Sequence, residues 1–196
     1  FSKGEARALG IDIGSSAIKI GQLKKRGAQA VRETYGELAL GPYAGLTIGQ
    51  AVVLPPDKIA AALIDLMKER EVNITTKSCG LSIPFASSLM SVIEMPEVSP
   101  KELATMVPLE ARKYIPVPID EVMLDWSIIP KSEIRDENET VEEASAVAKT
   151  PKIDVLTVAI HKETIARYQD IVVNAGLDAG FFTVEIFSTM RSVLDE

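Results

Sequence analysis

The first 38 residues of the chain alternate between apolar segments and short polar turns, and this order limits the fold more than any other feature. Ala8 to Ile13, Ala17 to Leu23 and Gln29 to Leu38 have the length and apolar content of strands. The turns between them, Gly14-Ser15-Ser16 and Arg26-Gly27, are short enough for hairpins. We therefore predict that the chain begins as a three-stranded meander.

A helix and a buried strand are predicted to follow the meander. Asp57 to Arg70 carries apolar residues at helical spacing after Pro55-Pro56, and SCGLSIP, residues 78–84, is typical of a buried strand. A helix between strands can return the chain parallel to the same sheet by a right-handed crossover. The order predicts a mixed α/β fold, and 196 residues suffice for one large domain or two small ones.

The second half of the chain opens with a strong helix-start signal. Ser99 stands at the cap position, Pro100 at the first helical position, and Glu102 where it can close a capping box. Apolar helical spacing continues through Val107, but Pro108 lacks a backbone N–H donor. We therefore predict a helix that kinks or breaks at Pro108.

Residues 114–129, YIPVPIDEVMLDWSII, are predicted to pass from an extended stretch into a strand. Val122, Leu124 and Trp126 share one side of this strand by alternation, and we interpret them as core residues. The polar, glutamate-rich segment 131–150 is predicted to be a mobile loop between two strands.

The last part of the chain repeats the change from strand to helix. Ile153 to Ile160 predicts a strand, Lys162 to Ala175 a helix, and Gly176 its left-handed carboxyl-end cap. FFTVEIF, residues 181–187, predicts a last short strand that leads into the start of another helix.

Charge and composition exclude several classes of site. The chain has 21 Lys and Arg against 28 Asp and Glu, a net charge of −7, and Lys24-Lys25-Arg26 is interpreted as a solvated hairpin tip, so no nucleic-acid binding is expected. Cys79 is the single cysteine, which excludes an intramolecular disulfide and a multi-cysteine zinc site. The single histidine, His161, follows an apolar strand and is interpreted as structural.

Leu38 to Pro56 carries no charge, but its glycines and prolines are incompatible with a membrane-spanning helix. We interpret it as a loop that contains a short strand, and we expect no direct insertion into a membrane.

GIDIGSSAIKIG, residues 10–21, permits two interpretations. A strand that turns at Gly14-Ser15-Ser16 offers consecutive N–H groups and two hydroxyls for phosphate, while Asp12 can hold magnesium through water and Lys19 adds positive charge. The same residues also suit an ordinary type I′ or II′ hairpin in which glycine supplies a positive φ and Asp12 is merely solvated. The segment is neither a Walker loop nor a Rossmann fingerprint, and the residues alone leave both interpretations open.

Two segments resemble the actin-like ATPase superfamily and, within it, the PilM family of type IV pilus assembly proteins. LGIDIGSSAIKIGQL, residues 9–23, resembles the first phosphate loop of the superfamily. Residues 95–129 resemble a more specific PilM-family stretch, in which a Met-Pro is followed by a capped helix, Glu-Ala, Tyr-Ile-Pro-x-Pro, Asp-Glu-Val and a strand. The matching residues are Met95-Pro96, Glu110-Ala111, Tyr114-Ile115-Pro116, Pro118 and Asp120-Glu121-Val122.

This resemblance covers nearly the whole chain and implies an α/β fold. An actin-like, ribonuclease H-like subdomain 1A is expected over residues 1–84 and 177–196, with an inserted α+β subdomain 1C over residues 85–176, in the position that FtsA-like proteins use. The resemblance implies that a full-length protein of this family is about twice as long as this chain. The second phosphate loop and the adenosine-binding glycine pair of such a protein are not found after Asp12. The chain therefore resembles the amino-terminal half of such a protein.

The resemblance also implies the site residues and cofactors. Asp12 corresponds to the carboxylate linked to magnesium through water, Gly14, Ser15 and Ser16 to the phosphate loop, and Lys19 to the phosphate-facing lysine. The expected cofactors are ATP and Mg²⁺. No catalytic residue is assigned, because such a protein is expected to be a nucleotide-binding assembly protein rather than an enzyme.

The implied partner is the cytoplasmic amino-terminal tail of a membrane-anchored PilN-type protein. The tail is expected to order in a groove that involves subdomains 1A and 1C, near Tyr114, Ile115 and Pro116. The protein is expected to be cytoplasmic, peripheral at the inner membrane through this partner, and to assemble with other pilus platform proteins.

The sequence leaves alternatives to pilus assembly. An FtsA-like cell-division protein and the platform of type II secretion use a related architecture. A sugar or acetate kinase of the same superfamily needs a catalytic carboxylate, and no candidate acid stands out in the inserted region. A mixed α/β binding module with an ordinary hairpin is the alternative from outside the superfamily.

Overall fold

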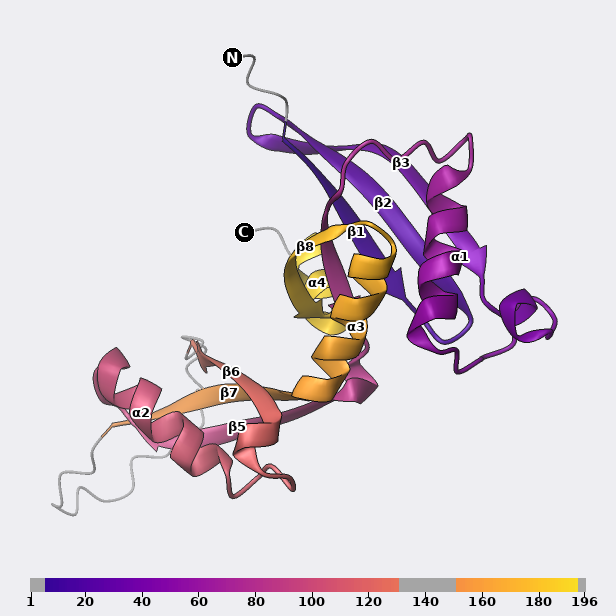
Figure 1. Ribbon diagram of the computed structural model, residues 1–196. Helices are drawn as coiled ribbons and strands as arrows, with labels where there is room; N and C mark the ends of the chain where they lie inside the picture. The colour runs from indigo at the N-terminus through magenta and orange to yellow at the C-terminus, as the bar shows by residue number, and fades with distance from the viewer. Residues whose placement is uncertain (1–5, 131–150, 194–196) are drawn as a thin grey trace, which may run out of the picture. The chain divides into compact units, whose positions relative to one another are not determined.

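The computed structural model describes residues 6–130 and 151–193. The chain divides into two compact units, one formed by residues 1–87 and 163–196 and the other by residues 88–162 (Figure 1). The predicted loop at 131–150 lies outside the described residues. Each unit has its own sheet and is described by itself.

The first unit is built on a five-stranded sheet with the strand order β3-β2-β1-β4-β8. Strand β1 pairs antiparallel with β2 and parallel with β4, and β4 pairs parallel with β8. The predicted meander and the parallel return of the chain are therefore confirmed. The strands are β1 (Arg7–Ile13), β2 (Ala17–Arg26), β3 (Gln29–Ala39), β4 (Ser78–Ile83) and β8 (Asp178–Val184), and the helices are α1 (Pro56–Lys68), α3 (Lys162–Asn174) and α4 (Glu185–Val193).

Alternation along β1 separates a core face of the sheet from a polar face. Leu9, Ile11 and Ile13 are buried, whereas Gly10 and Asp12 point to the other side. Buried apolar residues of β2 and β4 pair with them in register: Ile18 and Ile20, and Cys79 and Leu81. The sheet is thus anchored through one face, which leaves the face of Asp12 available for chemistry.

Helix α1 packs on the core face of the sheet, against β3. A Cβ atom added at Gly36 would lie 2.8 Å from a methyl group of Val72 and 2.9 Å from one of Leu66. Gly36 pairs with Ile20 of β2, so it belongs to the core face. Glycine is required here because the helix and the loop after it approach the strand closely.

Burial of Cys79 agrees with its prediction as a strand residue. The side chain is 2 % exposed, and this burial, together with the negative charge of Asp178, raises the pKa of its thiol. The thiol therefore stays protonated at neutral pH, which is the state expected of an unreactive core cysteine.

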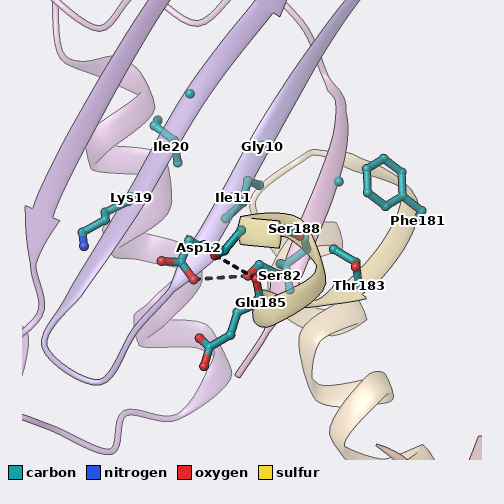
Figure 2. Close-up of a pocket in the computed structure, with 14 residues that line it drawn as sticks. Gly10, Ile11, Asp12, Lys19, Ile20, Ser82, Phe181, Thr183, Glu185 and Ser188 are labelled. Carbon is teal, nitrogen blue, oxygen red and sulfur yellow. Dashed lines mark hydrogen bonds between the residues drawn. The ribbon is translucent and has the colours of Figure 1, made fainter. Parts of the chain in front are cut away.

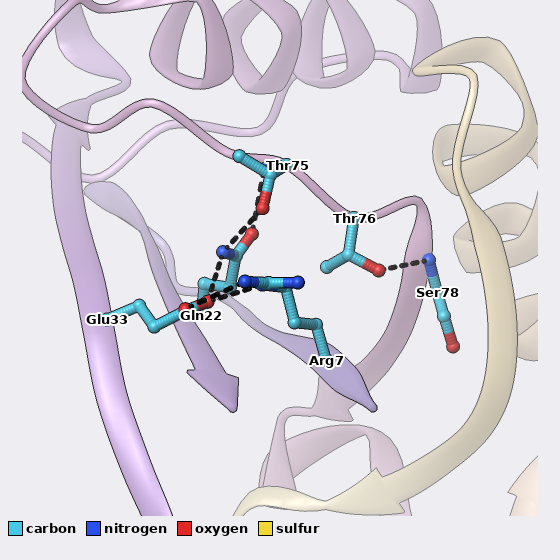
Figure 3. A network of polar contacts seen from close by, with 6 residues as sticks. All are labelled: Arg7, Gln22, Glu33, Thr75, Thr76 and Ser78. Carbon is cyan, nitrogen blue, oxygen red and sulfur yellow. Dashed lines mark hydrogen bonds and ion pairs between the residues drawn. The ribbon is translucent and has the colours of Figure 1, made fainter. Parts of the chain in front are cut away.

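Gln22 is a buried polar residue on the core face of β2, and a polar network satisfies its amide (Figure 3). Its Nε2 donates to Thr75 Oγ1 at 2.9 Å and to Glu33 Oε2 at 2.8 Å, and its Oε1 accepts from the backbone N–H of Thr75 at 2.8 Å. Arg7 Nε also donates to Glu33 Oε2, at 2.9 Å. The network ties β1, β2 and β3 to the segment that precedes β4, and it avoids the cost of an unpaired buried amide.

The second unit is a three-stranded antiparallel sheet with one face covered by a helix. Its strand order is β5-β7-β6, where β5 is Ser88–Pro96, β6 is Val122–Ile129 and β7 is Lys152–His161. Helix α2 (Pro100–Ala111) contributes Leu103, Val107 and Ala111 to the core of this unit. Val122 is buried there, and Leu124 and Trp126 pack against the same core, which confirms the predicted core side of β6.

The capping box predicted at the start of α2 is present, but the helix does not break at Pro108. The Ser99 side chain accepts from the Glu102 N–H, and the Glu102 carboxylate accepts from the Ser99 N–H at 3.0 Å. The helix continues through Pro108 to Ala111. A break is avoided because Pro108 lies in the last turn, where its missing N–H removes one hydrogen bond and buried Val107 and Ala111 hold the turn in place.

The short strand predicted within Leu38 to Pro56 is absent from the structure. After β3 the chain forms a 3₁₀ turn over Gly41–Ala44, and residues 45–55 contain no strand. Gly45 and Gly49 have φ values of 72° and 88°, a left-handed conformation that interrupts an extended segment.

Helix α3 ends at a glycine cap, as predicted. Gly176 has a φ of 73°, and the N–H of Leu177 donates to the carbonyl of Val172 at 3.0 Å. From Glu163 onward this helix groups with the first unit, whereas the inserted subdomain was expected to extend to residue 176.

We expect Glu33 to make the stability of the first unit depend on pH in the acid range. Hydrogen bonds from Arg7 and then Gln22 hold the pKa of the Glu33 carboxyl below its ordinary value of 4.5. A lowered pKa in the folded state stabilises the fold above that ordinary value, and the contribution disappears as pH falls through the folded-state value. Glu33→Gln should therefore lower the free energy of unfolding near neutral pH and lose this disadvantage in acid.

Urea unfolding of both proteins between about pH 3 and pH 7 measures the difference. A difference that stays constant across this range would show that the charge of Glu33 does not contribute.

Candidate functional site

A cavity of about 510 Å³ lies on the polar face of the first sheet (Figure 2). Strands β1, β2, β4 and β8 and the first turns of α4 contribute to its wall. The lining residues are Gly10, Ile11, Asp12, Lys19, Ile20, Gly21, Gly80, Leu81, Ser82, Phe181, Thr183, Glu185, Ser188 and Thr189.

Strand register brings the polar side chains of this cavity into one row. Asp12 pairs directly with Lys19 of β2 on one side and with Ser82 of β4 on the other, and Ser82 pairs with Thr183 of β8. The Ser82 hydroxyl donates to Asp12 Oδ1 at 3.3 Å. Residues from four strands therefore form one row, in which Lys19 and Ser82 flank Asp12 and Thr183 follows Ser82.

The neighbouring row is made largely of glycine. Gly21, Gly10 and Gly80 pair in register across β2, β1 and β4, and Phe181 of β8 follows Gly80. A Cβ atom added at Gly80 would lie 2.2 Å from the Phe181 ring, so the ring rests on the glycine backbone. The floor of the cavity beside Asp12 is consequently backbone rather than side chain.

The turn between β1 and β2 presents amide groups at the end of these strands. The N–H of Gly14 donates to the carbonyl of Ala17 at 3.0 Å and closes the turn. The carbonyls of Ser15 and Ser16 accept from the N–H groups of Val52 and Leu40, at 2.9 and 2.8 Å. Within the described residues, the N–H groups of Ser15 and Ser16 donate to no backbone acceptor.

The loop after β3 therefore orients this turn. Carbonyl and N–H groups of a trans peptide point in opposite directions, so the bond from Val52 to the Ser15 carbonyl directs the Ser16 N–H away from that loop. Gly14 does not have a positive φ, which contradicts the type I′ or II′ hairpin that was the alternative interpretation. Gly14 has a different constraint, since a Cβ atom there would lie 3.2 Å from the carbonyl oxygen of Ala17.

Only part of the predicted site lines this cavity. Asp12 and Lys19 line it, but they form no ion pair, and Gly14, Ser15 and Ser16 are absent from its wall. The predicted residues thus form two adjoining groups, a row of side chains on the sheet and a turn at the end of its first two strands.

Glu185 is a second carboxylate of this cavity that sequence reasoning missed. It is the first residue of α4, and its Oε1 accepts from the backbone N–H of Phe85 at 3.0 Å. Its position depends on the pairing of β8 with β4, which no local pattern reveals. The sequence prediction placed Glu185 inside a strand over residues 181–187, whereas β8 ends at Val184 and Glu185 begins α4.

Both carboxylates affect the pKa of the Tyr168 hydroxyl on α3. Burial raises the pKa of its hydroxyl, the positive charge of Arg167 lowers it, and the negative charges of Asp12 and Glu185 raise it. The net result is a raised pKa, so the hydroxyl remains protonated at neutral pH.

The donor set is compatible with a hydrated magnesium ion and phosphate. Magnesium usually keeps several waters and takes one or two carboxylates, which Asp12 and Glu185 offer. Among the described residues, no group of three or more His, Cys, Asp and Glu side chains could hold a metal directly. The unbonded amides of Ser15 and Ser16 suit phosphate oxygens.

The residues predicted for the partner groove differ in accessibility. Ile115 is buried in the core of the second unit, whereas Tyr114 is 51 % exposed and Pro116 is also exposed. Any partner at this position would therefore contact Tyr114 and Pro116, with Ile115 supporting the backbone from within.

A family model described as type IV pilus assembly protein PilM matches residues 10–195. The chain belongs to the PilM family. Among the described residues, no helix is long and apolar enough to cross a membrane.

Solved structures of low sequence identity share the fold. A chain of the PilM–PilN type IV pilus biogenesis complex is 24 % identical, with a TM-score of 0.71, and the match covers 95 % of this chain and 50 % of that one. The chain thus spans about half the length of the PilM–PilN complex chain that it matches. The predicted actin-like α/β fold class is confirmed.

Two other structures match more weakly. The cytoplasmic domain of EpsL, an inner membrane component of the type II secretion system of Vibrio cholerae, is 12 % identical, with a TM-score of 0.49 and coverage of 90 % of this chain and 57 % of that one. A Bacteroides thetaiotaomicron protein with an actin-like ATPase fold and unknown function is 14 % identical, with a TM-score of 0.36 and coverage of 93 % and 53 %.

Proposed function

We propose that this chain provides half of an ATP-binding cleft in a type IV pilus assembly protein and recruits the cytoplasmic tail of a PilN-type partner. The observation that carries the proposal is the alignment of Asp12, Lys19 and the Gly14-Ser15-Ser16 turn along β1 and β2 in a PilM-family chain. The protein acts as an assembly component rather than as an enzyme. Its place is the cytoplasmic side of the inner membrane, where it associates through its partner and other pilus platform proteins.

The arrangement supports phosphate binding by three separate contributions. The amides of Ser15 and Ser16 donate to phosphate oxygens, the Lys19 ammonium adds positive charge, and Asp12 holds Mg²⁺ through water. Gly14 keeps the turn narrow, because a side chain there would meet the Ala17 carbonyl. When bound, Mg²⁺ balances the negative charge of both the phosphates and the carboxylates.

The PilN-type partner follows from the family and from the solved complex of PilM with PilN. An extended tail gains affinity from main-chain hydrogen bonds and a few side-chain pockets. Tyr114 offers such a contact, because its aromatic side chain is half exposed next to a rigid Pro-x-Pro segment.

The family match favours pilus assembly over the FtsA-like and type II secretion alternatives. The same family match favours an assembly role over the activity of a sugar or acetate kinase.

Lys19→Ala in the full-length protein should weaken ATP binding in the presence of Mg²⁺ by about tenfold, because an ammonium close to the phosphates is lost. Lys25→Ala is the matched control, since Lys25 lies on the same side of β2 but at the far hairpin end. Calorimetric titration with ATP and Mg²⁺ measures both variants. Equal affinities of the two variants would remove Lys19 from the site.

Tyr114→Ala should weaken binding of a synthetic PilN-type amino-terminal tail by at least about tenfold, because the aromatic contact is lost. The full-length protein is titrated with the tail and with a scrambled peptide. Leu109→Ala, a similarly exposed apolar position on α2, serves as the control. If the tail binds but both variants behave like the unmodified protein, the partner docks away from Tyr114.

A further inference from the structure

The three-stranded sheet of the second unit has an apolar face that no described helix of this unit covers. Helix α2 packs against the side that bears Ile93, Val155 and Val122. Alternation places a different set of residues on the opposite side. This uncovered face consists of Met90 and Val92 of β5, Leu156, Val158 and Ile160 of β7, and Met123 of β6.

Exposure differs sharply between the two sides of the same strands. Val92 is 55 % exposed and Met123 is 56 % exposed, whereas their chain neighbours Ile93 and Val122 on the side of α2 are 1 % and 4 % exposed. The other members of the face, Met90, Leu156, Val158 and Ile160, are half-buried. The apolar surface is continuous across β5 and β7, because Val92 pairs with Leu156 and Met90 with Val158, and Met123 of β6 extends it beside Ile160. The other β6 neighbours of this surface are polar, with Asp125 beside Val158 and Ser127 beside Leu156. A contiguous, partly exposed apolar surface with a polar rim is characteristic of an interaction site.

Acidic side chains border the uncovered face. Asp125 of β6 pairs with Val158, and Asp154 of β7 pairs with Glu94 of β5 at the end of the apolar rows. Glu94 forms an ion pair with Lys152, but in the described part of the chain Asp125 and Asp154 have no ion-pair partner. The border therefore carries net negative charge.

The dimensions of the face match a single helix. Three strands about 4.8 Å apart give a surface about 10 Å wide, which is the diameter of an α-helix with its side chains. Its apolar part lies mainly on β5 and β7, and Asp125 and Ser127 make the β6 side polar, so the surface suits a helix with one apolar and one polar side. The 12-residue helix α2 covers the opposite side of the same sheet. A second helix of similar length would cover the uncovered face in the same way.

We propose that the uncovered face binds an amphipathic helix of a partner protein, with an apolar stripe against Val92, Leu156 and Val158 and with Lys or Arg residues at its border. The basic residues of this helix lie opposite Asp125 and Asp154. This surface belongs to the second unit, whereas the proposed nucleotide site belongs to the first, and it requires a helical partner rather than the extended tail proposed above.

The test measures binding of a designed probe to the full-length protein by fluorescence anisotropy. The probe is a labelled 18-residue helical peptide with a leucine stripe flanked by lysines, and a second peptide carries glutamate in place of each lysine. The lysine probe should bind saturably, and the glutamate probe at least about tenfold more weakly, because charge complementarity at the border is lost.

Variants of the protein locate the binding site. Val92→Lys should weaken binding of the lysine probe by at least about tenfold. Val173→Lys makes the same change at an exposed valine of α3 in the other unit, where Val173 is 70 % exposed, and should leave binding unchanged. The double variant D125N/D154N, which retains the apolar surface, should reduce the preference for lysine over glutamate.

Three outcomes would overturn the proposal. Equal binding of the two peptides would show that the acidic border does not select the partner. Equal loss in Val92→Lys and Val173→Lys would place the probe elsewhere or show non-specific binding. Dissociation of a dimer by Val92→Lys, measured by sedimentation, would assign the face to a second copy of the chain.

Discussion

The position of β1 between an antiparallel and a parallel neighbour is the constraint on which the first unit depends. Hydrogen bonds to β2 and β4 fix its register on both sides, and its alternation then divides the sheet into two faces. Leu9 and Ile11 are buried in the core. Because side chains alternate between the two faces of a strand, Asp12 lies on the other face, next to Lys19 and Ser82. A shift of one residue in this strand would bury Asp12 and expose the core residues.

The candidate site is a consequence of this register and of one loop. Its side chains come from separate strands, and its turn is held by the loop after β3 through the N–H groups of Leu40 and Val52. The bond to the Ser15 carbonyl directs the N–H of Ser16 away from this loop, and among the described residues the N–H groups of Ser15 and Ser16 donate to no backbone acceptor. The Ser16 N–H, one of the groups proposed to contact phosphate, is therefore oriented before any ligand binds, which reduces the ordering cost of binding.

Local signals predicted most of the elements, because hairpins, the capping box of Ser99 and the Gly176 cap each involve neighbouring residues. Two differences from the predictions depended on contacts between segments that are distant in the sequence, and one depended on the conformation of glycines. Core packing of α2 overrode Pro108, and glycines with left-handed φ values replaced the strand expected after Leu38. Glu185 was missed because only the pairing of β8 with β4, two segments distant in the sequence, brings it to the cavity of Asp12.

The most direct test of the central claim is an amide ¹H–¹⁵N chemical-shift titration of the full-length protein with ATP and Mg²⁺. If the turn binds phosphate, the amides of Ser15 and Ser16 shift most among the residues of this chain, and Lys19 shifts with them. If ATP binds while Ser15 and Ser16 remain unchanged, the turn does not contact phosphate and the nucleotide site lies elsewhere.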